Sequence, residues 1–250
     1  MMVFGKKIPM MLSLLVWFAV WELVGRSEAI IILPPFTGVI QAAMTVLPTA
    51  KFQNAAIITL EGFLAGMGLA IAVGIPLGVL MGRIKSVDAI FGVWVNVFMS
   101  APLTAVVPVL MVLFGFGQVT VILTVFLFAV WIIALDTQAG IKHINPSLLD
   151  MAHAFGATRV QLYVKVLVLA ALPEILAGVR LGVIRGCKGV IVGQLLIAII
   201  GMGELFELYS RNFLMEEFWV LIIVVFAFAF AVSELVAYVE RRIEYYASSR

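Results

Sequence analysis

The chain has 250 residues, of which 64% are hydrophobic and 12% are charged, and its formal net charge at pH 7 is +2. Its mean hydropathy is +1.19. Soluble domains are about half apolar and about a quarter charged, so this composition excludes a soluble enzyme. The abundance of large apolar residues excludes a disordered chain. The small net charge, with no basic stripe along the sequence, argues against nucleic acid as a partner.

Apolar segments between charged residues predict six membrane-spanning helices. A hydrocarbon core about 30 Å thick is crossed by about 20 helical residues. No charged residue lies between Asp88 and Asp136, and this segment is long enough for two helices joined by a turn over residues 115–118. The six predicted spans cover residues 8–24, 59–81, 89–114, 118–135, 181–200 and 218–239. The sequence therefore predicts a single all-α integral membrane domain over residues 1–250.

The distribution of lysine and arginine orients these spans. With the N-terminus inside, all of the 16 Lys and Arg residues except Arg26, Lys51 and Arg211 fall at or near the cytoplasmic face. This bias follows the positive-inside rule and predicts that both termini are cytoplasmic. In the outer connection after the first span, two prolines precede an apolar stretch. That stretch predicts a short interfacial helix with Thr37 as its N-cap.

The second predicted span carries a series of small residues at intervals of four or nearly four. They are Gly62, Gly66, Gly68, Gly74, Gly78 and Gly82. Small residues let two membrane helices approach closely, so we expect this series to form a helix contact.

The longest polar connection, residues 136–180, lies on the predicted cytoplasmic side. Asn145, Pro146 and Ser147 favour a helix start, and Gly156 favours a helix end. Between them, apolar residues recur at helical spacing: Leu148, Leu149, Met151, Ala152 and Phe155. A short amphipathic helix on the cytoplasmic side of a membrane protein fits a groove on a partner protein. The structural alternative is a turn that only reverses the chain.

Residues 150–156, which read Asp-Met-Ala-His-Ala-Phe-Gly, resemble the EAA loop of ABC-importer permeases, in which Glu-Ala-Ala is followed by glycine. Residues 100–108 and 113–117 resemble the third-span signature of the nitrate, sulfonate and taurine branch of that family. Residues 172–180 resemble its proline-containing entry to span five. The similarity keeps the family's order from about residue 33 to residue 242. Asp136 stands where asparagine is common, and Gln194 stands where the branch usually has a membrane-embedded glutamate.

The resemblance implies a type I ABC-importer permease bundle with six transmembrane helices in a bacterial cytoplasmic (inner) membrane. It also implies the partners: two ATP-binding cassette subunits, a second permease chain that we expect to be identical, an extracytoplasmic substrate-binding protein and the surrounding lipid. The chain has no GxxxxGK[ST] sequence, so ATP and Mg are expected on the partner, and we predict no cofactor, metal or catalytic residue here. The resemblance assigns ATPase docking to a cytoplasmic coupling helix made of Ser147, Leu148, Leu149, Asp150, Met151, Ala152, His153, Ala154, Phe155, Gly156 and Ala157.

Two groups of polar residues are candidates for the translocation pathway. Asn96, Ser100 and Thr104 recur at intervals of four, close to two prolines that are expected to bend the third span. The same residues would equally serve as packing contacts, and the family resemblance favours the pathway.

The fifth span holds the second group. Arg185 and Lys188 are three residues apart and are expected to share one helix face, where they attract an anionic substrate or extend to the inner headgroups. The amide of Gln194 lines either the pathway or a helix contact.

The resemblance favours a small anion as cargo, of the sulfonate, taurine, nitrate or carboxylate type, moved by alternating access. Permeases of the same branch also handle pyrimidine and other heterocyclic nutrients, which is the alternative for the cargo. A secondary transporter would need an internal repeat and charges near the midplane, and no convincing repeat is present. An intramembrane enzyme would need catalytic groups within the spans, yet both histidines, His143 and His153, lie in the cytoplasmic loop.

Overall fold

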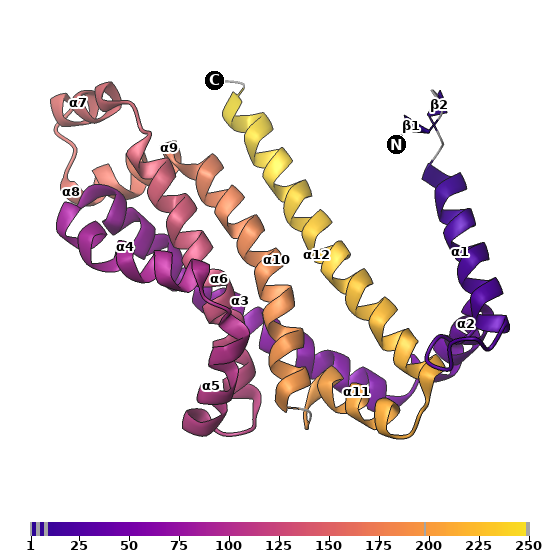
Figure 1. Cartoon of the computed structure of the whole chain (residues 1–250). Helices are drawn as coiled ribbons and strands as arrows, with labels where there is room; N and C mark the ends of the chain where they lie inside the picture. The colour runs from indigo at the N-terminus through magenta and orange to yellow at the C-terminus, as the bar shows by residue number, and fades with distance from the viewer. Residues whose placement is uncertain (1, 4–5, 8–9, 198, 249–250) are drawn as a thin grey trace.

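The computed structural model describes residues 2–3, 6–7, 10–197 and 199–248, which fold almost entirely as helices (Figure 1). Two short strands, β1 (Met2–Val3) and β2 (Lys6–Lys7), pair antiparallel with Met2 opposite Lys7. The helices are α1 (Met10–Arg26), α2 (Phe36–Val46), α3 (Ala50–Arg83), α4 (Lys85–Ser100), η1 (Leu103–Val106), α5 (Val107–Phe114), α6 (Gln118–Lys142), α7 (Pro146–Ala154), α8 (Arg159–Gln161), η2 (Leu162–Leu167), α9 (Val168–Ala170), α10 (Leu172–Ile197), α11 (Gly201–Arg211) and α12 (Met215–Ser248).

The all-helical membrane architecture predicted from the sequence is confirmed. By length and composition, α3, α6 and residues Met215–Val239 of α12 can each cross a membrane. Two bent helix pairs among the described residues bring this number to five, and α1 adds a further apolar helix of 17 residues. Ile8 at the start of the first predicted span and Ala198 within the fifth lie outside the described residues.

The third predicted span, residues 89–114, is made of separate helices with a sharp bend between them. α4 ends at Ser100, and the segment Leu103–Phe114 leaves it at an angle of 101°. Ala101 has φ −73° and ψ 147°, which is extended backbone. Because a residue that precedes proline is disfavoured in the helical region, Pro102 stops the helix instead of bending it.

Several helices extend beyond the predicted spans, because the apolar window marks only the part that matches the hydrocarbon thickness. α3 starts nine residues before position 59, where the Thr49 side chain accepts a hydrogen bond from the backbone N–H of Phe52 at 3.2 Å. α6 continues past position 135 to Lys142, and α10 begins at Leu172, well before position 181. α12 extends the last span, 218–239, at both ends.

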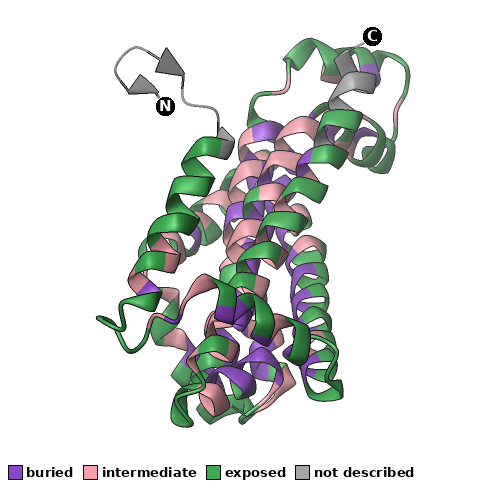
Figure 2. Ribbon diagram, turned by 90° about the vertical axis from the view of Figure 1, so that its right-hand side faces the viewer, coloured by how far each residue is buried: buried purple, intermediate pink, exposed green. Residues whose placement is uncertain are grey.

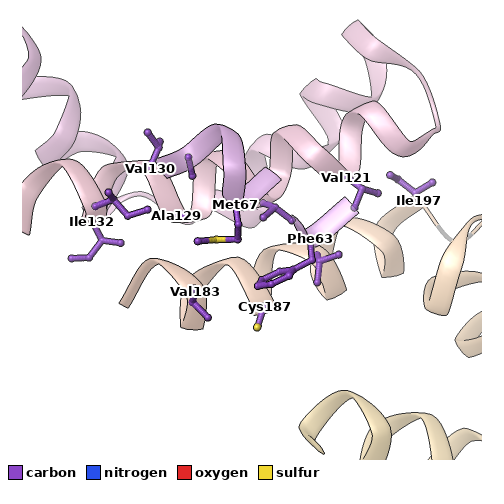
Figure 3. Close-up of a cluster of buried hydrophobic side chains, with 13 residues drawn as sticks. Phe63, Met67, Val121, Ala129, Val130, Ile132, Val183, Cys187 and Ile197 are labelled. Carbon is purple, nitrogen blue, oxygen red and sulfur yellow. The ribbon is translucent and has the colours of Figure 1, made fainter. Parts of the chain in front are cut away.

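The core lies between α3, α6 and α10, with Phe63 and Met67 of α3 buried against residues of the other two helices (Figure 3). α3 and α6 run parallel: the position of a Cβ on Gly62 would lie beside Val121, and that of Gly82 beside Ile141. Five of the six predicted small residues of α3 face α6 in this way, and Gly68 does not, since no heavy atom lies within 4 Å of its Cβ position.

α10 runs antiparallel to α6 and carries a second small-residue face that sequence reasoning missed. The Cβ position of Gly178 would lie 2.8 Å from the Asp136 side chain, and that of Gly193 would lie 3.3 Å from Thr124. The three central helices therefore pack at close range through glycine on both sides of α6.

A second apolar cluster joins α2, α11 and α12 at the end of the molecule away from α7. α1 contacts this region but is exposed along most of its length (Figure 2). Thr37 is not the N-cap of α2, and that prediction is wrong: Pro35 occupies the cap position. Instead, the carboxylate of Glu22 in α1 accepts hydrogen bonds from the backbone N–H of Thr37 at 3.0 Å and from its hydroxyl at 2.9 Å.

Candidate functional site

α7 is a short helix with well-defined ends. The side chain of Asn145 accepts a hydrogen bond from the backbone N–H of Ser147 at 3.0 Å and caps the N-terminus. At the other end, the N–H of Gly156 donates to the carbonyl of His153, and the N–H of Ala157 donates to the carbonyl of Ala152. Gly156 has φ +72°, which a residue with a Cβ adopts only with strain. This pattern is a Schellman motif, and it stops the helix.

The observed helix is displaced from the predicted segment 147–157. α7 begins one residue earlier, at Pro146, and ends at Ala154, so Phe155, Gly156 and Ala157 form the turn that follows it. The displacement follows from the Schellman motif, in which the left-handed glycine lies two residues beyond the last helical residue.

The two faces of α7 differ in their surroundings. Ala152 is buried, and Leu149 packs against the cluster formed by Ile141 of α6 and Leu167 of η2, among others. On the outer side, the exposed fractions are 38% for Leu148, 50% for Met151 and 86% for Phe155. Ser147, Asp150, His153 and Ala154 are also exposed. Figure 1 shows α7 at one end of the molecule, beyond the spanning helices. The helix is thus anchored on one side and presents an apolar surface on the other.

The candidate polar residues of the third span lie on both sides of the break after α4. Asn96 and Ser100 belong to α4 and Thr104 to η1, and all three side chains are exposed. The opposite side of α4 packs on α6, where the rings of Phe98 and Trp131 stack with centroids 4.6 Å apart. The polar side chains therefore face away from this contact between α4 and α6.

Arg185 and Lys188 do not point to the same neighbour. The guanidinium of Arg185 is directed toward α4, where Nη1 lies 3.2 Å from Sδ of Met99. Lys188 is exposed and lines a groove of about 470 Å³ between α10 and α12, together with Phe226 and Phe230. A separation of three residues on a helix is about 60° short of a full turn, which is enough to direct the two cations to different sides.

Gln194 lies inside the protein, where α3, α10 and α11 meet. Its side chain is fully buried, and its Oε1 lies 2.8 Å from the hydroxyl of Thr59. The same hydroxyl accepts a hydrogen bond from the backbone N–H of Met202 at 3.2 Å. Among the described residues, Nε2 of Gln194 has no hydrogen-bond partner. The structure thus places this amide in a helix contact, and Thr59, which sequence reasoning missed, is its partner.

Comparison with known proteins decides the family. Residues 74–245 match the family described as the binding-protein-dependent transport system inner membrane component. The chain belongs to this family. The resemblance to ABC-importer permeases is thereby confirmed, and the protein is a multi-pass membrane permease.

Two curated relatives illustrate the range of this permease family. The taurine transport system permease protein TauC of Escherichia coli is 28% identical over 198 residues, covering 76% of this chain and 72% of TauC. The bicarbonate transport system permease protein CmpB of Synechococcus elongatus is 27% identical over 179 residues, covering 70% of this chain and 64% of CmpB. Among solved structures, the inward-facing methionine ABC transporter MetNI superposes with a TM-score of 0.63 at 21% identity, covering 76% of this chain and 94% of that chain. The permease therefore has the fold of an ABC-importer membrane chain.

In this permease, a polar contact that the sequence did not predict joins α4 to α6 near α7. The carboxylate of Asp88 accepts a hydrogen bond from the Lys142 ammonium at 2.7 Å and another from the side-chain amide of Gln138. Asp88 and Lys142 are 54 positions apart, so no local spacing signals the pair. The contact holds the start of α4 against the end of α6, the helix that leads into α7.

Proposed function

We propose that this permease is the membrane subunit of an ATP-driven importer, and that a separate ATP-binding subunit docks on α7 and drives alternation between inward-open and outward-open states. The observation that carries the proposal is the exposed apolar side of α7, formed by Leu148, Met151 and Phe155. Apolar residues grouped on a helix that is anchored on its other side are stabilised when a partner groove covers them. The anchored side, at Leu149, would transmit the movement of the partner to η2 and α6.

The docking proposal is tested with purified transporter that contains its ATP-binding subunits. Phe155→Ala removes the most exposed apolar side chain next to α7, and we expect substrate-stimulated ATP hydrolysis to fall at least tenfold while membrane yield stays unchanged. Gly156→Glu and Asp150→Lys should uncouple the complex in the same way. Phe116→Ala is the matched control, because Phe116 is 63% exposed in the turn at the opposite end of α6. If Phe155→Ala and Phe116→Ala kept equal stimulation, α7 would not be the docking site.

Docking of an ATP-binding subunit on α7 also implies a membrane topology and further partners for this permease. α7, the start of α1 and the end of α12 lie at one end of the molecule (Figure 1), which supports the proposal that this end is cytoplasmic. Two ATP-binding subunits would hold ATP and Mg there, a second, identical permease chain would complete the pathway, and a substrate-binding protein would approach the other end.

Topology is tested by labelling with a membrane-impermeant thiol reagent after Cys187, the single cysteine, is replaced by alanine. We expect His153→Cys to react only in inverted vesicles and Phe213→Cys, between α11 and α12, to react in intact cells. Labelling of His153→Cys in intact cells would place α7 where no ATPase reaches it and would refute the proposal.

For the cargo we propose a small anion of the sulfonate, taurine, nitrate or carboxylate type. One support comes from the relatives named for taurine and bicarbonate transport. The other is Arg185, a partly buried cation that points from α10 toward α4. Asn96, Ser100 and Thr104 would line the route with it.

The assignment is tested by measuring which compounds enter cells that express the complete transporter. We expect uptake of taurine, bicarbonate or nitrate and no uptake of a pyrimidine. Uptake of the pyrimidine alone would identify a heterocyclic nutrient as the cargo instead of an anion. Uptake that persists without the ATP-binding subunit would identify a secondary transporter instead.

A further inference from the structure

The guanidinium of Arg185 is a partly buried charge whose neighbours satisfy it poorly. Its one hydrogen bond among the described residues goes to Sδ of Met99 at 3.2 Å, and a thioether is a weak acceptor. No carboxylate of the described residues lies within ion-pair distance of it. A guanidinium offers five N–H donors in a planar fork that matches carboxylate, sulfonate and phosphate groups. Arg185 therefore has the donors and the charge to hold an anion.

Asp136 is a carboxylate of α6, the helix against which this part of α10 packs. The Cβ position of Gly178 lies 2.8 Å from the Asp136 side chain, and Arg185, seven residues later, lies on nearly the same side of α10. Side chains on a helix lean toward its N-terminus, so Arg185 leans toward the level of Gly178 in α10. At that level the Cβ position of Gly178 lies 3.5 Å from a carboxylate oxygen of Asp136. A shift of α10 relative to α6 would change the separation of the two charges.

The surroundings of Arg185 differ from those of Lys188 on the same helix. Arg185 is adjacent to Met99, the residue next to the exposed Ser100 at the end of α4. Lys188 lines the groove toward α12, whose other lining side chains are apolar except Ser233. Arg185 thus contacts the end of α4 that carries Ser100, whereas Lys188 lies in an environment suited to acyl chains.

We propose that Arg185 is the residue that makes the route selective for anions, and that Asp136 is a positioning residue that competes with the bound anion for Arg185 and so promotes its release. The inference rests on the proposed function, since it names the group that recognises the proposed class of cargo. An anionic substrate would accept hydrogen bonds from Arg185 on entry. Approach of the Asp136 carboxylate would then replace the substrate, because both compete for the same fork of donors.

The test reads the local charge directly and needs no transported substrate. In a Cys187→Ala background, Ser100→Cys serves as a reporter, and the purified complex in nanodiscs is treated at low ionic strength with an anionic or a cationic methanethiosulfonate reagent. The ratio of the two reaction rates reports the electrostatic potential at the end of α4. One charge about 8 Å away in water changes this ratio roughly fivefold, because it attracts one reagent and repels the other.

We expect Arg185→Gln to lower the anionic-to-cationic ratio about fivefold and Asp136→Asn to raise it. Arg185→Lys should keep the ratio, which separates loss of charge from loss of packing. The proposal is overturned if Arg185→Gln leaves the ratio unchanged, if Lys188→Gln lowers it equally, or if Ser100→Cys reacts with neither reagent.

A second measurement assigns the role of Asp136. In the complete transporter, with taurine as the probe, Asp136→Asn should lower both the apparent KM and kcat, because the anion binds longer and leaves more slowly. An Asp136→Asn variant with lower kcat and unchanged KM would refute competition for Arg185. If the wild-type complex transports none of taurine, bicarbonate and nitrate, the cargo assignment fails while the cysteine ratios still decide the role of Arg185.

Discussion

Gly78 and Gly68 provide a matched pair of positions for testing how closely α3 and α6 are packed. Both lie in the interior of α3. A Cβ added at Gly78 would lie 2.5 Å from the carbonyl oxygen of Ala134 and 2.6 Å from Cβ of Thr137. A Cβ added at Gly68 would have no heavy atom within 4 Å. Alanine at these two positions therefore differs in its contacts, with the same change in composition.

The expected difference follows from the distances. An ordinary carbon–oxygen contact is about 3.4 Å, so alanine at position 78 forces α3 and α6 apart by roughly 1 Å at this point. Overpacking of this kind costs about 1–3 kcal/mol. Replacement of glycine by alanine within a helix gains up to about 1 kcal/mol in propensity, but this gain is common to both variants and cancels in the comparison. We expect Gly78→Ala to be about 1–3 kcal/mol less stable than Gly68→Ala.

The difference is measured by reversible unfolding of the purified protein in mixed micelles with increasing SDS, followed by the fluorescence of its five tryptophans. Gly68→Ala should unfold at the midpoint of the wild type or above it, and Gly78→Ala should unfold clearly below. Equal midpoints for the two variants would refute close approach of α3 and α6 at Gly78. A destabilised Gly68→Ala would show that the outer side of α3 is covered by something other than lipid.

Three further changes test contacts at the end of the molecule away from α7. Thr59→Val leaves the buried Gln194 amide and the Met202 N–H without their partner and should cost about 1–3 kcal/mol in the same SDS assay. Thr59→Ser should restore stability, and equal stability of the two variants would contradict the network. Gly203→Ala places a Cβ 2.0 Å from the backbone oxygen of Gln194, so we expect the free energy of unfolding to fall by about 3 kcal/mol and the folded yield to fall sharply. A normal yield would show that α11 can move away from α10. Glu22→Ala removes the acceptor at the start of α2 and should speed amide hydrogen exchange in the first turn of that helix. Glu22→Gln keeps an acceptor and should not speed it. Unchanged exchange in both variants would mean that the contact does not stabilise the start of α2.

Features that depend on neighbouring residues were predictable from the sequence. α7 has its cap at Asn145 and its stop at Gly156, and both signals lie within the helix or next to it. The glycines of α3 were expected to form a helix contact, and all but Gly68 do so. The structure differs from these expectations in two places. At the start of α2, a residue distant in the sequence supplies the hydrogen bonds, and after α4, a proline ends the helix. The carboxylate of Glu22 satisfies the start of α2 from 15 residues away, and Pro102 ends α4 instead of bending it.

The amino-acid sequence was enough to identify a helical membrane protein, its apolar segments and a short amphipathic helix after the fourth span. These properties depend on residue type and short-range spacing, which the hydrocarbon thickness and the helical period translate directly into structure. The neighbour that each polar residue of α10 faces depends instead on how the helices pack together. Spacing fixes the angle between Arg185, Lys188 and Gln194 on their helix, but the rotation of that helix against α4, α12 and α3 is set by the packing of its glycines on α6.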